Sequence, residues 1–243
     1  MKTFLPLACA LFCASSFANS EPSYFINLTA GHSSFAGDNA VQRGTNQGNT
    51  PVNGYDVDSG GLYGLGVGYR FGNGFALQLE WRTREYETDS TPQPANPAGG
   101  LADQTFQVLG KNETDTIMLN AYYEFDMAAE NFKPYIKAGV GTAKHDVNAE
   151  LDIQPWFQTL DFSTLTACPD NPLFCYPSND SSEFAWSIGA GFNYQLTENV
   201  SVGLDYQYID FKDSQTNLDP LGDQAVFPDL KAHEFSATLT YTF

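Results

Sequence analysis

The sequence predicts an all-β protein, an eight-stranded antiparallel up-and-down transmembrane β-barrel with long extracellular loops. Three observations support this fold class. Eight segments alternate with period two between apolar or aromatic residues and small or polar residues. The connections between these segments alternate between short and long, as expected for a meander. One face of the segments combines charged side chains with many glycines, which suits the polar interior of a narrow membrane barrel.

Each of the eight alternating segments has one apolar face and one small or polar face. A representative segment, 75–85, places Phe75, Leu77 and Trp81 on one face and Glu80 and Arg82 on the other. In chain order, the expected strands are 24–34, 62–71, 75–85, 114–125, 134–144, 184–194, 200–209 and 232–243.

The connections set the expected topology. Glycine, proline, asparagine and aspartate punctuate them, as turns and loops require. The short connections are 72–74, 126–133 and 195–199, and the long ones are 35–61, 86–113, 145–183 and 210–231. Because the strand count is even, both chain termini are expected on the short-turn side, which in a Gram-negative outer membrane is the periplasm.

The charged face is expected to point into the barrel. Charges facing lipid would be costly, and glycines in the wall of a narrow barrel leave room for large side chains from other strands. We predict a polar network in the lumen, with four acids and three bases whose near balance limits unpaired charge. Its members are Arg70, Glu80, Arg82, Glu124, Lys137, Asp205 and Glu234. A soluble lipocalin-like carrier is disfavoured, because none of the tryptophans lies in a Gly-x-Trp motif.

Aromatic residues gather on the apolar face at the strand ends beside the short turns. Such a belt is typical of a membrane–water interface, where amphipathic rings are favoured. Its expected members are Tyr69, Phe71, Phe75, Tyr123, Phe125, Phe192, Tyr194, Tyr241 and Phe243.

Composition excludes two classes of protein. The 243 residues include 29 Asp and Glu but only 11 Lys and Arg, a formal charge of −18, so a nucleic-acid partner is not expected. No apolar run of 18 or more residues follows the N-terminal region, which argues against a polytopic helical membrane protein. Much of the acid excess falls in the third and fourth long loops.

Residues 1–18 have the pattern of a secretory signal peptide, with the barrel domain expected over 19–243. Lys2 precedes the apolar stretch 4–14, and small residues stand at Ser16 and Ala18 before the expected cleavage site. Cleavage there leaves Cys168 and Cys175, and this even pair in an oxidising compartment predicts a disulfide.

Several stretches resemble the small Gram-negative outer-membrane barrels of the OmpA, OmpX and opacity-protein type. They are GLGVGYRFGNGFALQLEW, KPYIKAGVGTA, LTENVSVGLDYQY and the C-terminal HEFSATLTYTF. The resemblance, which covers 19–243 as a pattern, implies a monomer in the outer membrane, in contact with its lipid and lipopolysaccharide. It also implies that Tyr241 and Phe243 form the signal read by the barrel-assembly machinery.

The residues that could carry chemistry point to a protein without a cofactor. His32, His145 and His233 are scattered, so no metal site is expected. An enzyme alternative rests on His32 and Ser34, whose His-x-Ser spacing is similar to that of a lipid A deacylase family of outer-membrane barrels, but no acidic partner can be placed. The first alternative, ahead of this enzyme, is a narrow gated pore, because eight strands leave an interior only just filled by side chains.

The third long loop contains large apolar residues that we expect to pack on the loop itself or to contact a host or envelope protein. The expected members of this loop contact patch are Trp156, Phe157, Phe162 and Phe174. From the sequence alone we therefore expect a non-enzymatic barrel with an envelope-structural or adhesin-like role.

Overall fold

The computed structural model describes most of the chain. The described residues are 21–36, 41–44, 48–51, 55–90, 93–94, 105–127, 131–154, 175–176, 180–215 and 223–243. The expected signal peptide, Cys168 and the four aromatic residues of the loop contact patch lie outside these ranges.

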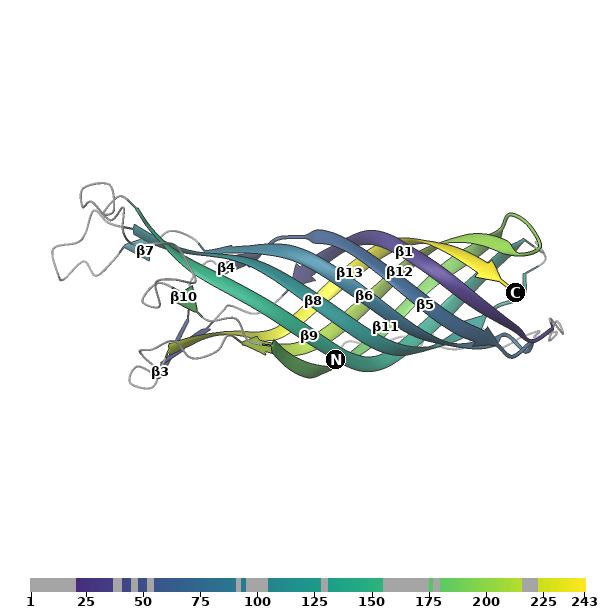
Figure 1. The fold of residues 1–243 in the computed structure, drawn as a ribbon, viewed down its shortest axis with the longest axis horizontal. Helices are drawn as coiled ribbons and strands as arrows, with labels where there is room; N and C mark the ends of the chain where they lie inside the picture. Colours follow the sequence, from purple (N-terminus) through teal and green to yellow (C-terminus); the bar gives the residue numbers. More distant parts are fainter. Residues whose placement is uncertain are drawn as a thin grey trace, which may run out of the picture.

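Eight long antiparallel strands form a closed barrel, which confirms the predicted fold class (Figure 1). Each strand pairs with the next one along the barrel, and the first pairs with the last through a register running from Phe25↔Thr242 to Ala36↔Lys231. The strands are β1 (Ser23–Ala36), β5 (Gly60–Arg70), β6 (Phe75–Ser90), β8 (Thr105–Glu124), β9 (Phe132–Gln154), β11 (Asp180–Gln195), β12 (Val200–Gln215) and β13 (Asp223–Thr242).

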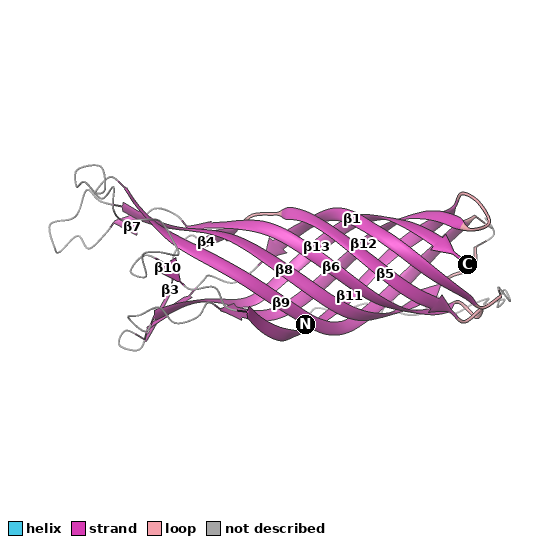
Figure 2. Ribbon diagram, in the orientation of Figure 1, coloured by secondary structure: helices cyan, strands magenta, loops and turns pink. Residues whose placement is uncertain are grey.

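Five short strands extend this sheet at the end of the barrel opposite the C-terminus (Figures 1 and 2). At that end β2 pairs with β13 and β3 with β2, while β4, β7 and β10 pair with β6, β8 and β9. Their bounds are Val41–Gly44, Gly48–Pro51, Tyr55–Val57, Gln93–Pro94 and Cys175–Tyr176. We call this the long-loop end and the other the short-turn end.

The strands reach further into the long loops than the sequence analysis expected. The segments predicted as 114–125 and 134–144 are parts of β8 and β9, which stay paired from Thr105↔Gln154 to Glu124↔Tyr135. In β9 the alternation of apolar and polar residues continues in the sequence through Val147, Ala149, Leu151 and Ile153, so following it past 144 would have extended the predicted strand.

The outward face of the barrel is apolar and the inward face is polar. Leu28, Val140 and Phe235 are exposed by 55%, 52% and 61%, whereas Gln78 and Asn120 inside are exposed by only 1% each. Large exposed apolar surfaces mark contact with lipid or a partner. Among the described residues, no helix has the length and apolarity needed to cross a bilayer.

The aromatic belt lies at the short-turn end, as expected. Its rings contact one another in pairs, with centroids 5.0 Å apart for Tyr69–Phe71 and for Tyr241–Phe243. The turn between β5 and β6 shows why the chain reverses so tightly there, since Gly72 and Gly74 have φ angles of 80° and 85°, which favour glycine.

Candidate functional site: the barrel lumen

Arg82 on β6 lies at the centre of the lumen and is 2% exposed. Its Nη2 atom is 2.9 Å from Glu80 Oε1 and 3.7 Å from Asp205 Oδ1, and its Nη1 donates to Glu234 Oε2 at 3.0 Å. One guanidinium therefore joins carboxylates from β6, β12 and β13. We call this buried set of charges the ionic layer.

Lys137 on β9 completes the ionic layer from the other wall. Its ammonium pairs with Asp205, which also accepts a hydrogen bond from the Tyr135 hydroxyl at 3.0 Å. Lys137 and Asp205 are 3% and 4% exposed, so each charge depends on its partners rather than on bulk water.

Arg84 belongs to the same layer, although the sequence analysis missed it. It is fully buried, pairs with Glu234 and donates from Nη1 to Thr116 Oγ1 at 2.9 Å. With Arg84 included, the ionic layer contains three bases and three acids. Arg84 has the same strand parity as Glu80 and Arg82, so extending the inward alternation of β6 by one step would have found it.

Arg70 and Glu124 form a separate pair nearer the short-turn end. Arg70 Nε lies 3.3 Å from Glu124 Oε2 and Nη1 donates to Thr242 Oγ1 at 3.1 Å, while Asn193 donates to Glu124 at 3.3 Å. This pair remains partly exposed, with side-chain exposures of 18% and 13%. The seven predicted lumen residues are thus divided into two levels.

Glycines in the wall make space for these large side chains. A Cβ on Gly64 would lie 2.8 Å from Arg82 Cγ, and one on Gly189 would lie 2.9 Å from Lys137 Cε. A Cβ on Gly191 would come within 2.6 Å of the Tyr135 hydroxyl. The prediction that wall glycines accommodate side chains from other strands is therefore confirmed.

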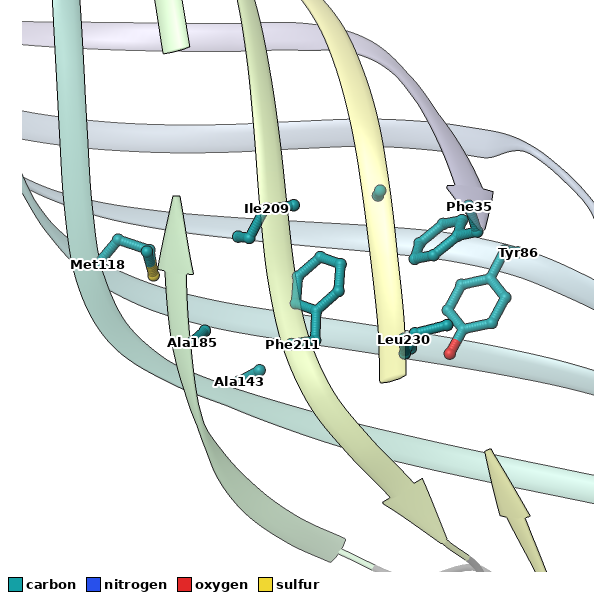
Figure 3. Packing of buried hydrophobic residues seen from close by; sticks show 9 residues of the cluster. Phe35, Tyr86, Met118, Ala143, Ala185, Ile209, Phe211 and Leu230 are labelled. Carbon is teal, nitrogen blue, oxygen red and sulfur yellow. The ribbon is translucent and has the colours of Figure 1, made fainter. Parts of the chain in front are cut away.

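An apolar layer fills the lumen on the long-loop side of the ionic layer (Figure 3). Phe211 links the two layers, because Arg84 Cζ lies 5.1 Å from the centre of its ring and Phe35 stacks on it at 6.1 Å. The layer comprises Phe35, Tyr86, Met118, Ala143, Ala185, Ile209, Phe211, Leu230 and Ala232, all at most 8% exposed. Four of these residues lie in segments that the sequence analysis took as loops: Phe35, Tyr86, Phe211 and Leu230. The others occupy inward positions of the predicted strands, where polar or glycine residues were expected.

His145 lies beside the apolar layer, at the level where the outward neighbours Lys144 and Asp146 are exposed. Its Nδ1 is 2.9 Å from Thr114 Oγ1, and its ring meets Phe211 edge-on at 6.0 Å. Burial lowers the pKa of His145 to about 4, and the nearby Arg84 charge acts in the same direction. The imidazole is therefore neutral at pH 7.

Two cavities occupy the short-turn half of the lumen. The outer one, of about 170 Å³, is lined by polar residues that include Arg70, Glu124 and Lys133. The inner one, of about 20 Å³, lies against Glu80, Arg82 and other members of the ionic layer. A polar cavity of this smaller size has room for about one water molecule. The described lumen is thus hollow and polar on one side of the ionic layer and packed with apolar side chains on the other.

The remaining candidate residues are not brought into a reactive cluster. His32 and Ser34 both lie on the outward face of β1, separate from the buried His145. In the described ranges, no group of three or more His, Cys, Asp or Glu is arranged to hold a metal ion. Cys175 lies in β10, opposite Glu150, and its predicted partner Cys168 is outside the described residues.

The C-terminal residue is tied to the first strand. Phe243 N donates to Tyr24 O at 2.9 Å, and its ring is 68% exposed on the outward face beside Tyr241. The predicted assembly signal is therefore an aromatic pair at the seam that closes the barrel.

Comparison with known proteins agrees with this architecture. Residues 4–243 match the model of the family described as outer membrane protein beta-barrel domain. The chain belongs to this family. It is 31% identical over 192 residues to the outer membrane protein PagN of Salmonella typhimurium, covering 74% of this chain and 72% of that relative. An uncharacterized protein of Brucella suis is 28% identical over 164 residues, which are 64% of this chain and 53% of that protein, so the match spans about half of its length.

Solved structures show the same fold at low sequence identity. OprG of Pseudomonas aeruginosa is 15% identical with a TM-score of 0.56, and the match covers 91% of this chain and 96% of OprG. The outer membrane protease OmpT of Escherichia coli is 11% identical with a TM-score of 0.50, covering 95% of this chain and 99% of OmpT. At these identities the likeness concerns the fold alone.

Proposed function

We propose that this outer-membrane barrel is a closed, non-enzymatic platform that presents its long loops to partners at the cell surface. The main support for this proposal is the packing of the barrel interior, where an apolar layer covers a charge-balanced ionic layer. Ions and polar solutes are strongly disfavoured in a dry apolar constriction. The closed lumen leaves the exterior of the barrel and its long loops as the surfaces available for function.

We further propose that the long-loop end faces the outside of the cell and that the chain ends face the periplasm. Short turns on one side and long loops on the other are the usual arrangement of such barrels. The acidic residues of the third and fourth loops would then lie at the surface, with the loop contact patch (Trp156, Phe157, Phe162 and Phe174) available for contact with a host or envelope protein.

Conductance measurements test the closed interior. The refolded wild-type protein should be silent in a planar bilayer. Lys137→Ala should leave Asp205 without its ammonium partner, which either destabilises the barrel by roughly 3–5 kcal/mol or opens a wet path. Lys133→Ala, which changes a cation in the outer cavity rather than in the ionic layer, is the matched control and should behave like wild type.

A narrow pore is the second candidate, because the two cavities bring polar space from the short-turn end to the ionic layer. Such a pore would require the apolar layer to open. Steady conductance by the wild-type protein would therefore reject the closed platform in favour of a pore. A conductance change in Lys133→Ala alone would show that the barrier to ions is in the outer cavity rather than in the ionic layer.

Exchange of the third loop tests the surface role. Cells producing a chain in which residues 155–174 are replaced by a short Asn-Gly linker should insert the barrel normally and attach less to cultured host cells. Unchanged attachment combined with new sensitivity of the outer membrane to detergent would instead favour an envelope-structural role.

A further inference from the structure

One sector of the outward face differs from the rest of the barrel wall. We call it the histidine–aromatic sector, and it runs over the long-loop halves of β11, β12, β13 and β1. Its members are Trp186, Tyr206, Tyr208, His233, Phe235 and His32. Two of the three histidines in the chain lie in it, both exposed.

Cross-strand contacts hold this sector together. Tyr208 is directly opposite His233 and Tyr206 is opposite Phe235, while His32 lies opposite Phe235 from the other side. The ring centroids of Tyr208 and His233 are 5.4 Å apart, those of Trp186 and Tyr208 are 5.6 Å apart, and those of Tyr206 and Phe235 are 5.0 Å apart. The sector is therefore one continuous surface.

The Tyr206 hydroxyl orients His233, because its oxygen lies 2.8 Å from His233 Nδ1. When this hydroxyl donates to Nδ1, the proton of the neutral imidazole is on Nε2, which leaves an N–H donor for a ligand. When His233 is protonated, Nε2 is again a donor and now also carries positive charge.

Basic residues continue the sector towards the long-loop end. Lys231 lies two residues from His233 towards the long-loop end, on the outward side of β13, and Lys212 is exposed on β12. Both lie near the buried carboxylate of Asp210, which is opposite Lys231 in register and has Oδ2 at 3.6 Å from Lys212 Nζ. These lysines bring two of the chain's 11 Lys and Arg residues to the end of the sector.

The opposite wall carries the reverse charge. Glu85 on β6, Glu113 on β8 and Asp146 on β9 are directly opposite one another in register, and all three are exposed. We call these three residues the acidic wall. Like charges placed side by side repel one another and would also repel an anionic headgroup. Among the described residues, the two lysines therefore lie by the sector and this group of three acids lies on the opposite wall.

We propose that the histidine–aromatic sector binds the phosphorylated headgroup of a glycolipid in the outer leaflet. Aromatic rings are favoured at the boundary between acyl chains and headgroups, and histidine and lysine N–H groups form charge-assisted hydrogen bonds with phosphate oxygens. The phosphate group also distinguishes this proposed ligand from uncharged lipids. The proposal rests on the proposed orientation, in which the long-loop end faces outward.

Glycolipid retention tests this binding directly. The protein is refolded into phosphatidylcholine bilayers containing a small fraction of bisphosphorylated lipid A or of dephosphorylated lipid A, then extracted gently, and the retained glycolipid is counted by native mass spectrometry. Wild type should retain the phosphorylated form selectively. His32→Gln, His233→Gln and Lys231→Gln should each reduce retention, with about a fivefold loss for the lysine cation in Lys231→Gln.

The acidic wall supplies the matched control. Glu85→Gln with Glu113→Gln should retain as much phosphorylated lipid A as wild type, or more. Tyr206→Phe removes only the hydroxyl that orients His233, and it serves as a further variant if the sector replacements fail to fold. It should lower retention and leave the heat-modifiable mobility of the folded barrel unchanged.

Three results would overturn the sector as a phosphate site: equal retention of the dephosphorylated lipid, wild-type retention by the sector variants, or an equal loss in the acidic-wall control. Protease digestion of intact cells tests the orientation independently. Loops that resist digestion from outside but are cut after outer-membrane rupture would refute the proposed function, while selective retention in bilayers would still establish the phosphate site.

Discussion

Arg84 shows how one residue connects the two layers of the lumen. Its guanidinium pairs with Glu234 in the ionic layer, and it also lies over the Phe211 ring in the apolar layer. A planar cation can make both contacts at once, whereas a lysine ammonium cannot match the same geometry. The boundary between polar and apolar packing therefore depends on the chemistry of a single side chain.

His145 provides a prediction for the pH dependence of stability. The pKa is about 4 in the folded barrel and about 6.5 in an unfolded chain, so the unfolded state binds more protons between these values. Stability should be full above pH 6.5 and should fall by roughly 3 kcal/mol as the pH drops to about 4. Arg84 is the charged group that opposes protonation, while Thr114 and Phe211 contact the ring.

Urea unfolding of the detergent-refolded barrel at pH 7.5 and pH 4.5 measures this effect. The carboxylates also begin to titrate near the lower pH, so the informative quantity is the difference between wild type and His145→Gln. The variant should lose less stability on acidification. Parallel pH profiles for the two proteins would show that His145 is not buried as a neutral imidazole.

At the residue scale, strand parity was the useful signal in the sequence. It selected inward positions such as Glu80, Lys137 and Asp205, which the structure brings together. It could not tell that Arg70 and Glu124 occupy a different level, because height in a barrel depends on strand tilt and register rather than on alternation. Ile209 and Phe211 share the inward parity of Asp205, but they were not assigned to the lumen because apolar residues in such a barrel usually face lipid.

At the element scale, the strands differ in how closely their backbones meet. Gly31 on β1 contributes to the pair that closes the barrel, and a Cβ there would lie 2.2 Å from the backbone oxygen of Phe235. Gly66 on β5 is also crowded, but its nearest neighbours are side-chain amide atoms of Asn27 and Gln78, each at 2.3 Å. Backbone cannot move aside as easily as the ends of flexible side chains.

Gly31→Ala should therefore destabilise the barrel more than Gly66→Ala. Forcing extra volume into a tightly packed site typically costs about 1–3 kcal/mol, and the strained contact in Gly31→Ala falls on the closing pair β1–β13. Tryptophan fluorescence during urea unfolding gives both free energies of unfolding. If Gly31→Ala matches wild type while Gly66→Ala does not, side-chain packing in the lumen rather than closure of the wall limits stability.

The sequence indicated where strands cross the lipid but not where they end. In β9 the alternation continues through Val147 to Ile153, but these residues stand in a segment that glycine, proline and acidic residues marked as a loop. The additional strands β2, β3, β4, β7 and β10 are only two to four residues long, too short for a pattern to identify them. Their pairing depends on neighbouring strands brought close by the barrel, which a linear sequence does not display.

At the scale of the whole molecule, the barrel is polar and hollow towards the short-turn end and apolar and filled towards the long-loop end. We propose that the two ends have different roles, with the short-turn end recognised during assembly and the long-loop end presenting the surface that contacts partners. The expected assembly signal, Tyr241 and Phe243, lies at the first of these ends, beside the start of β1.

Deletion of Phe243 should impair insertion in cells far more than it impairs folding in detergent. Its ring is 68% exposed and its backbone makes one hydrogen bond to Tyr24, so the direct loss of stability should be only about 1 kcal/mol. A large defect in cells must then arise from recognition by the assembly machinery. Phe71→Ala is the matched control, because it removes another exposed aromatic ring from the belt at the same end.

Two measurements separate recognition from closure of the barrel. Outer-membrane insertion is followed by fractionation of cells, and folding in detergent by the heat-modifiable mobility of the purified protein. The deletion should lower the first sharply and preserve the second, while Phe71→Ala should change neither by much. Failure of the deletion variant in both settings would show that Phe243 is needed to close β13 against β1, because an open sheet edge is not tolerated in lipid. Normal insertion in cells would show that the C-terminal aromatic is not the signal.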